Sequence, residues 1–233
     1  DDLQKCYQYR DGGRAHPFMF GGSQFIWTND TYTSVDPYSG KPIGRFSVFD
    51  GKTDTATKFI DSIVPAQNAW RETPWKVRAE YLYALAHKLQ TPEWTWRFVS
   101  ALMLEVGKSG PEAYGEYNEV YRFVLQHVYW MYRRYTECDH VPSAEFTGDV
   151  FAYSMKGKGI GVVIAPFNFP SAIPIRMATL MLAFGDTVIL KGSDKASLTT
   201  LLIYEVCEEV RRETKIGLQG IINFAPGPGG ELA

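Results

Sequence analysis

The fold is decided by three stretches near the end of the chain: GVVIAPFNFP at residues 161–170, TVILKGSD at 187–194 and NFAPGPG at 223–229. The first two contain runs of apolar and β-branched residues, and the third directly follows such residues at 221–222; these runs favour buried strands. All three stretches end in proline, glycine or polar residues, which favour a loop. Apolar residues at helical spacing lie between the stretches. The chain therefore predicts strands over 161–165, 187–191 and 220–224, with helices over 171–183 and 198–212.

This β-α-β-α-β order predicts an α/β fold, in which a parallel sheet is joined by right-handed crossovers and flanked by helices. Sheets of this kind bind ligands outside the carboxyl ends of their strands. The residues that directly follow each strand are therefore the candidates for a functional site.

The residues upstream of the sheet divide into a strand-rich and a helical part. Gly21-Gly22 and the Asp36-Pro37…Gly40 segment are turn signals between alternating aromatic and polar residues, which favours a hairpin followed by a turn at 36–40. Residues 55–135 change to helical spacing, which Pro65 interrupts. Thr91-Pro92 is a typical helix start, and we expect Gly107 to end that helix.

Composition excludes several classes of protein. The chain has 233 residues, 45% of them hydrophobic, and its formal charge is −2. A chain of this kind folds, and it lacks the basic surface of a nucleic-acid-binding protein. Prolines interrupt the longest uncharged run, Gly159–Ile175, so we expect no membrane insertion. Cys6, Cys138 and Cys207 are scattered and odd in number, which argues against disulfides or a zinc site and for a reducing compartment.

Asn168 follows the first strand, in a loop stiffened by Pro166 and Pro170. Its amide can donate hydrogen bonds to an oxyanion without adding a charge. The alternative is that Asn168 only caps the next helix or bonds its own turn, and spacing alone favours this alternative.

Polar and flexible residues follow the other two strands. Lys191, Ser193 and Asp194 place a cation, a hydroxyl and a carboxylate where they can bind ribose hydroxyls, although a solvated turn or a helix cap explains them equally well. Gly227 and Gly229 let the backbone approach a flat ligand, as a plain turn also would. No G-x-G-x-x-G fingerprint is present.

The three stretches together resemble the cofactor-binding half of the aldehyde dehydrogenase superfamily, in order and in spacing. Upstream, Glu105-Val106-Gly107-Lys108 with Glu112-Ala113 and Glu116 is similar to the E-x-G-K-x-x-x-E-A segment of that family, and 148–151 resembles the strand that leads into its site. The resemblance extends from about Phe18 to Ala233. Within the superfamily these motifs are most similar to those of the 1-pyrroline-5-carboxylate (glutamate semialdehyde) dehydrogenases.

The resemblance implies NAD-dependent oxidation of a small aldehyde to a carboxylic acid. It makes Asn168 the oxyanion-hole amide and places the cofactor against the following residues: Ala165, Pro166 and Phe167 at the nicotinamide, Lys191, Ser193 and Asp194 at the adenosine ribose, and Gly227 and Gly229 beside the adenine. Asp194 would repel the 2′-phosphate of NADP, which makes NAD the favoured cofactor. Gly192 and Ala233 depart from the family, which usually has Pro and Gly there, and Gly192 is expected to make the ribose loop more flexible.

The resemblance also implies that part of the enzyme is missing. The nucleophilic cysteine and the glutamate base of the family lie beyond Ala233, so we expect no activity from these residues alone. With only three parallel strands, the sheet is expected to be incomplete and to leave an open edge. The expected partners are a homo-oligomer or the missing C-terminal half, and the expected location is intracellular, in the cytoplasm or the mitochondrial matrix.

The expected domain organisation has three sections: a strand-rich lead-in and oligomerisation arm over 1–54, the helical part of the cofactor domain over 55–147 and a βαβαβ NAD-binding core over 148–233. Two alternatives remain open. One is a non-catalytic structural subunit of a larger assembly, and the other is an isolated nucleotide-binding module.

Overall fold

The computed structural model describes residues 15–21, 24–26, 30–48, 53–137, 141–142, 150–151 and 155–228. Its helices are α2 (Thr53–Glu72), α3 (Trp75–Leu89), α4 (Pro92–Val106), α5 (Gly110–Glu137), α6 (Ala172–Phe184) and α7 (Ser197–Thr214), with a short 3-10 helix η1 (Asp194–Ala196). Its strands are β1 (Ala15–His16), β2 (Phe18–Phe20), β3 (Gln24–Ile26), β4 (Thr31–Val35), β5 (Pro42–Ser47), β6 (Val141–Pro142), β7 (Val150–Phe151), β8 (Ile160–Ile164), β9 (Thr187–Lys191) and β10 (Ile222–Phe224).

The predicted parallel sheet is confirmed. β8, β9 and β10 run parallel in that order, and Ile189 of β9 lies between Val162 and Asn223 of its neighbours. The ladder continues into the loops, because the Ala165 N–H donates to the Lys191 carbonyl at 3.0 Å and the Ala225 N–H to the Leu190 carbonyl at 2.9 Å. All three carboxyl ends therefore lie at one edge of the sheet.

The first hairpin joins this sheet. β2 and β3 form the expected hairpin, and β2 pairs antiparallel with β10, which gives the order β3-β2-β10-β9-β8. Phe18 and Phe20 pack there against Phe59 and Ile63 of α2. The second hairpin, β4–β5, pairs with β1 in a separate sheet. Among the described residues, the edge of the main sheet at β8 has no partner strand, whereas β2 covers the edge at β10.

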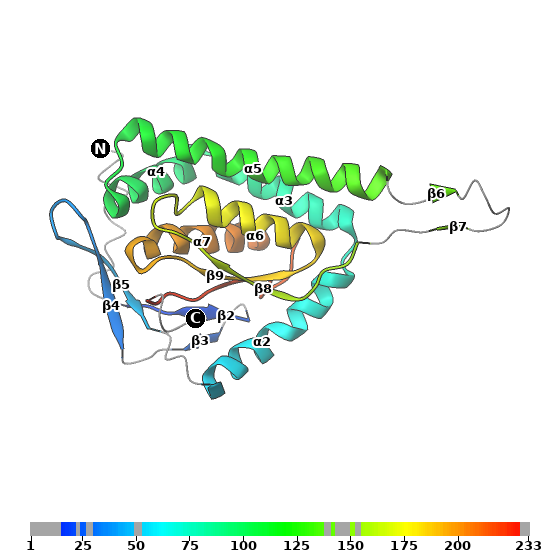
Figure 1. The fold of residues 1–233 in the computed structure, drawn as a ribbon, viewed down its shortest axis with the longest axis horizontal. Helices are drawn as coiled ribbons and strands as arrows, with labels where there is room; N and C mark the ends of the chain where they lie inside the picture. The colour runs from blue at the N-terminus through cyan, green and yellow to red at the C-terminus, as the bar shows by residue number, and fades with distance from the viewer. Residues whose placement is uncertain are drawn as a thin grey trace.

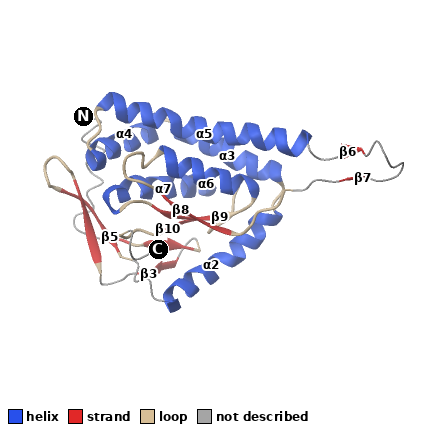
Figure 2. Cartoon of the chain, viewed as in Figure 1, coloured by secondary structure: helices blue, strands red, loops and turns tan. Residues whose placement is uncertain are grey.

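Helices cover both faces of the main sheet. Val188 and Leu190 of β9 face the larger core with α6 and α7, whereas Ile189 faces the smaller core with α2. Helices α3, α4 and α5 form a further layer over α6 and α7 (Figures 1 and 2). Helix α2 is continuous through Pro65. Gly107, in the left-handed conformation at φ 69°, ends α4 as expected.

Two buried glutamates cap the crossover helices. The Glu105 carboxylate on α4 accepts hydrogen bonds from the backbone N–H groups of Leu198 and Thr199 at the start of α7, at 2.7 and 2.8 Å. The Glu116 carboxylate on α5 accepts from the N–H groups of Ser171 and Ala172 at the start of α6, at 2.9 and 3.1 Å. The first turn of a helix leaves such donors unpaired, and its dipole favours a negative charge.

The other end of α6 is also held by side chains from outside the helix. The Trp70 indole N–H donates to the Leu182 carbonyl and the Arg78 guanidinium to the Ala183 carbonyl, both at 3.0 Å. Gln67 binds the Gly185 carbonyl and accepts from the Thr187 N–H, which joins the end of α6 to the start of β9. Helix α6 is therefore fixed at both ends by side chains from α2, α3 and α5.

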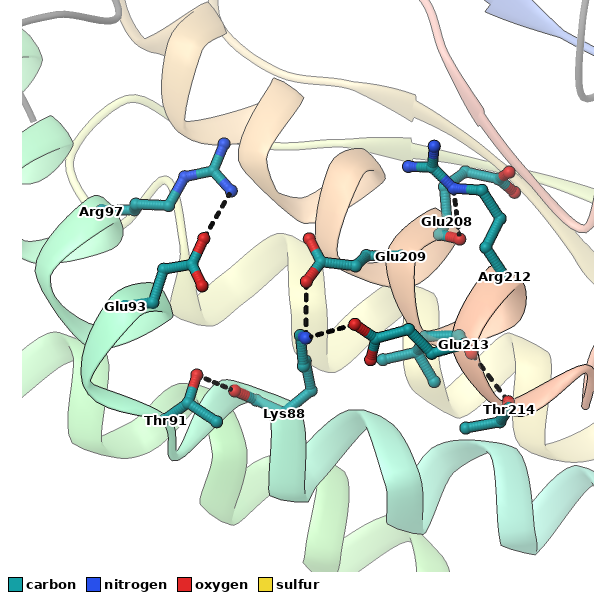
Figure 3. Close-up of polar contacts among 10 residues, drawn as sticks. Lys88, Thr91, Glu93, Arg97, Glu208, Glu209, Arg212, Glu213 and Thr214 are labelled. Carbon is teal, nitrogen blue, oxygen red and sulfur yellow. Dashed lines mark hydrogen bonds and ion pairs between the residues drawn. The ribbon is translucent and has the colours of Figure 1, made fainter.

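Ion pairs tie the outer face of α7 to α3 and α4. The Lys88 ammonium of α3 lies 2.5 Å from Glu209 and 2.8 Å from Glu213 (Figure 3). Arg97 of α4 lies 2.8 Å from Glu205. None of the helices in the described ranges is long and apolar enough to cross a membrane.

His127 is buried between α5 and α6, where its Nδ1 lies 2.9 Å from the Thr179 hydroxyl. Burial, with a smaller contribution from Arg176, lowers the pKa of His127 from 6.5 to about 4. His127 is therefore neutral in the folded protein at neutral pH.

The lowered pKa of His127 predicts acid-dependent stability. Because the unfolded chain binds this proton more tightly, the free energy of unfolding should fall as pH decreases from 6.5 towards 4. His127→Gln should remove about 2 kcal/mol of that pH dependence. Urea unfolding of both proteins at neutral and acidic pH measures the effect, and an equal slope in the variant would contradict it.

The cap at α7 predicts a large effect of Glu105→Gln. Burial raises the pKa of Glu105 to about 7, while four hydrogen bonds oppose the rise. All four groups donate, so an amide NH2 in place of one oxygen leaves donors unpaired and should cost about 1–3 kcal/mol of stability. Glu119→Gln, on the exposed face of α5, is the matched control and should change stability by less than about 0.5 kcal/mol.

Candidate functional site

Three loops meet at the carboxyl edge of the main sheet: 165–171 after β8, 191–196 after β9 and 225–228 after β10. The candidate residues that the sequence predicts lie on these loops, with the exception of Gly229, which is outside the described residues. Parallel register brings Ala165 and Gly227, which are 62 positions apart in the chain, to one edge.

The loop after β8 presents Asn168 at the surface. Asn168 is exposed, and its side chain forms no hydrogen bond with another described residue. The alternative role for Asn168 is to cap the next helix. In the structure it is Glu116 that caps this helix, by binding the N–H groups at the start of α6. The Asn168 amide is therefore available to a ligand.

The same loop is held by lysines over its aromatic rings. Phe167 and Phe169 are 49% and 41% exposed. The Lys195 ammonium lies 5.3 Å from the centre of the Phe167 ring, and the Lys108 ammonium lies 3.9 Å from that of Phe169. Ala165 is buried at the base of the loop and Pro166 is exposed. The contact from Lys195 joins the loop after β8 to the loop after β9.

Lys191 ends β9 as a buried cation, and no ion pair joins it to a carboxylate of the described residues. It is 3% exposed, and its ammonium donates to the Gly192 carbonyl at 2.8 Å. Burial lowers its pKa, while Asp194 acts in the opposite direction. An ammonium group has three N–H donors, and the described residues supply an acceptor for one of them. A ligand hydroxyl at this edge would satisfy the donors that remain.

Ser193 and Asp194 are half-buried beside Lys191. The Ser193 hydroxyl donates to the Asp194 carboxylate at 3.1 Å and accepts from the Lys195 N–H at 3.2 Å. The capping alternative for Ser193 is thus correct for η1. The Asp194 carboxylate keeps further acceptor positions, because a carboxylate can accept about four hydrogen bonds.

Gly192 is closely packed against α7. A Cβ atom at this position would overlap the Thr200 hydroxyl, which binds the Ala196 carbonyl at 3.1 Å. The side chain of Thr200 thus occupies the space that a larger residue at 192 would need. Close packing against Thr200 gives a physical reason for glycine at position 192. The sequence predicts that this glycine makes the loop more flexible, whereas the structure shows it tightly packed.

Sequence reasoning did not single out Tyr32. Its hydroxyl forms a hydrogen bond with the Ser197 hydroxyl at the start of α7. The two residues are 165 positions apart and belong to no common motif, so no sequence signal joins them. Glu105 and Glu116 did stand in a recognised segment, but the sequence did not reveal that they cap helices.

The described residues contain neither a reactive thiol nor a metal site. Cys207 is buried in α7, and burial raises the pKa of its thiol to about 12, so no thiolate forms at neutral pH. Cys6 and Cys138 lie outside the described residues. Within those ranges, no three His, Cys, Asp or Glu side chains come together as metal ligands would.

Comparison with known proteins agrees with this geometry. A solved 1-pyrroline-5-carboxylate dehydrogenase from Thermus with bound NAD superposes with a TM-score of 0.82 and 25% identity, over 99% of this chain and 42% of that one. The curated 1-pyrroline-5-carboxylate dehydrogenases of Bacillus subtilis and Bacillus cereus are each 29% identical, over 94% and 100% of this chain.

The chain spans about two fifths of the length of those curated relatives, 40% and 42%. Both are bacterial proteins, and they lend no support to a mitochondrial location. The model of the aldehyde dehydrogenase family matches residues 26–233, which include all three loops of the site. This chain therefore belongs to the aldehyde dehydrogenase family.

Proposed function

We propose that this chain supplies the NAD-binding part of an enzyme that oxidises an aldehyde to a carboxylic acid. Family membership supports the reaction class. The names of the relatives and the NAD in the Thermus structure favour glutamate semialdehyde, the open form of 1-pyrroline-5-carboxylate, as substrate and NAD as cofactor. No observation on the described residues favours the alternative of a non-catalytic structural subunit.

The observation that carries the proposal is the buried ammonium of Lys191. Among the described residues, the Lys191 ammonium has an acceptor for one of its three donors, and a buried cation with unpaired donors is destabilising unless a ligand completes its hydrogen bonds. Vicinal ribose hydroxyls suit this position, because Lys191 can donate to them while Asp194 accepts from them. The cofactor therefore fits the residues present, with its adenosine at the ends of β9 and β10.

The loop after β8 would then contact the nicotinamide end of the cofactor and the substrate. NAD, when bound, accepts a hydride from the substrate carbon. Ala165, Pro166 and Phe167 would line the nicotinamide side, and the Asn168 amide would donate to the substrate oxygen as negative charge develops on it. One donor of this kind is typically worth about 2.7–4 kcal/mol of the barrier.

The cysteine nucleophile and the glutamate base of the family would come from residues outside this chain. On this proposal the chain alone binds NAD without turnover, and the complete site also needs those groups. The open edge at β8 is compatible with further strands that join the sheet there.

Lys191→Met tests the cofactor site. Because the variant keeps an unbranched apolar stem and removes the ammonium, the Kd for NAD should rise at least about tenfold. Isothermal titration calorimetry measures the change. Lys76→Met, on the exposed face of α3, is the matched control and should leave the Kd unchanged. An unaltered Kd in the Lys191 variant, or no NAD binding by the unmodified chain, would refute the proposal.

Asp194→Ala tests the choice of cofactor. The Asp194 carboxylate repels a 2′-phosphate, so its removal should narrow the preference for NAD over NADP by about tenfold. Competition between the two nucleotides in the same titration gives the ratio. Raising the salt concentration should produce a smaller change in the same direction.

A further inference from the structure

We propose that Tyr32 is a positioning residue for the adenosine end of the cofactor site. Its hydroxyl holds the loop after β9 through Ser197, and its ring packs through Phe46 against β10. Since the loop after β9 carries the proposed ribose contacts, this inference rests on the proposed function.

The hydrogen bonds around Tyr32 form a chain with one direction. The Ser197 hydroxyl donates its only proton to the Ser193 carbonyl at 3.1 Å, so it accepts the proton of the Tyr32 hydroxyl. The hydrogen bonds therefore run from the Tyr32 hydroxyl to the Ser197 hydroxyl and on to the Ser193 carbonyl.

These hydrogen bonds hold one loop of the site from outside it. Ser193 lies in the loop after β9, beside Lys191 and Asp194. Tyr32 comes from β4, in the other sheet, and its hydrogen bond with Ser197 joins that sheet to the loop.

The ring of Tyr32 is held independently of its hydroxyl. It stacks on Phe46, with ring centres 5.7 Å apart, and Phe46 contacts Phe224 of β10 at 6.4 Å. Two residues along β4, the Ser34 hydroxyl donates to Glu105 at 3.0 Å, the carboxylate that caps α7. A phenylalanine at 32 would therefore keep the ring in place and remove only the hydrogen bond with Ser197.

The Tyr32 hydroxyl keeps its proton at neutral pH. Burial is the largest effect on the Tyr32 phenol, and it raises the pKa well above the ordinary value of 10.0. The hydroxyl can therefore donate to Ser197 at neutral pH.

Tyr32→Phe tests the inference by titration of the chain with NAD and, separately, with AMP. Because the loss concerns the adenosine end, the Kd for NAD and the Kd for AMP should rise by a common factor of about five to ten. The matched control is Tyr81→Phe, which loses a buried hydroxyl that donates to the Cys207 carbonyl at 3.0 Å, away from the loops. Its Kd values should not change.

Ser197→Ala removes the hydroxyl that joins Tyr32 to the Ser193 carbonyl. It should raise both Kd values as Tyr32→Phe does, and the double variant should lose little more than either single one. Thermal unfolding of all four variants identifies any general loss of stability.

Three results would overturn the inference: unchanged binding of AMP to the Tyr32 variant, an equal loss in the Tyr81 variant, or full additivity of the Tyr32 and Ser197 changes. Failure of the unmodified chain to bind NAD or AMP would reject the proposed function as well. Normal NAD binding by both the unmodified chain and the Tyr32 variant would reject only the role of Tyr32.

Discussion

The arrangement at the sheet edge depends on two carboxylates that are buried at helix N-termini. Removing a charged group from water is costly unless hydrogen bonds compensate it, and the first turn of a helix offers unpaired N–H donors together with a favourable dipole. Glu105 and Glu116 use these donors, at α7 and α6. Each cap joins the outer helical layer to the helix that follows a strand, so the site loops are fixed from outside the sheet.

The glutamate cap on α6 also affects where a dinucleotide can bind. In many dinucleotide-binding proteins the cofactor phosphates bind the N-terminus of the first crossover helix, next to a G-x-G-x-x-G turn. Here Glu116 binds those amides at α6, and the turn contains Pro166 and Pro170 in place of the glycines. The absence of G-x-G-x-x-G therefore goes together with a helix N-terminus that a glutamate already occupies. A buried cation at this edge is Lys191, at the end of β9.

Much of the fold could be predicted because its signals are local. β9 has the expected bounds, and the crossover helices begin and end within two residues of expectation. At the site, parallel order alone placed Asn168, Lys191 and Gly227 at one edge. Local patterns could not show that β2 pairs with β10, since the partners Met19 and Phe224 are far apart in sequence. Nor could they show that Glu208, in a run of charges expected to be solvated, is 6% exposed and bound to Arg211.

The sequence by itself determined the class of fold, the order of the parallel strands and the residues that follow each strand, because hydrophobic period and turn chemistry are properties of neighbouring residues. Only the tertiary structure decided which buried groups have partners: the capping of α6 by Glu116 instead of Asn168, the packing of Thr200 against Gly192, and the hydrogen bond between Tyr32 and Ser197. Such pairings depend on which side chains the packed helices and sheets bring together over distances of many residues, and no local pattern records them.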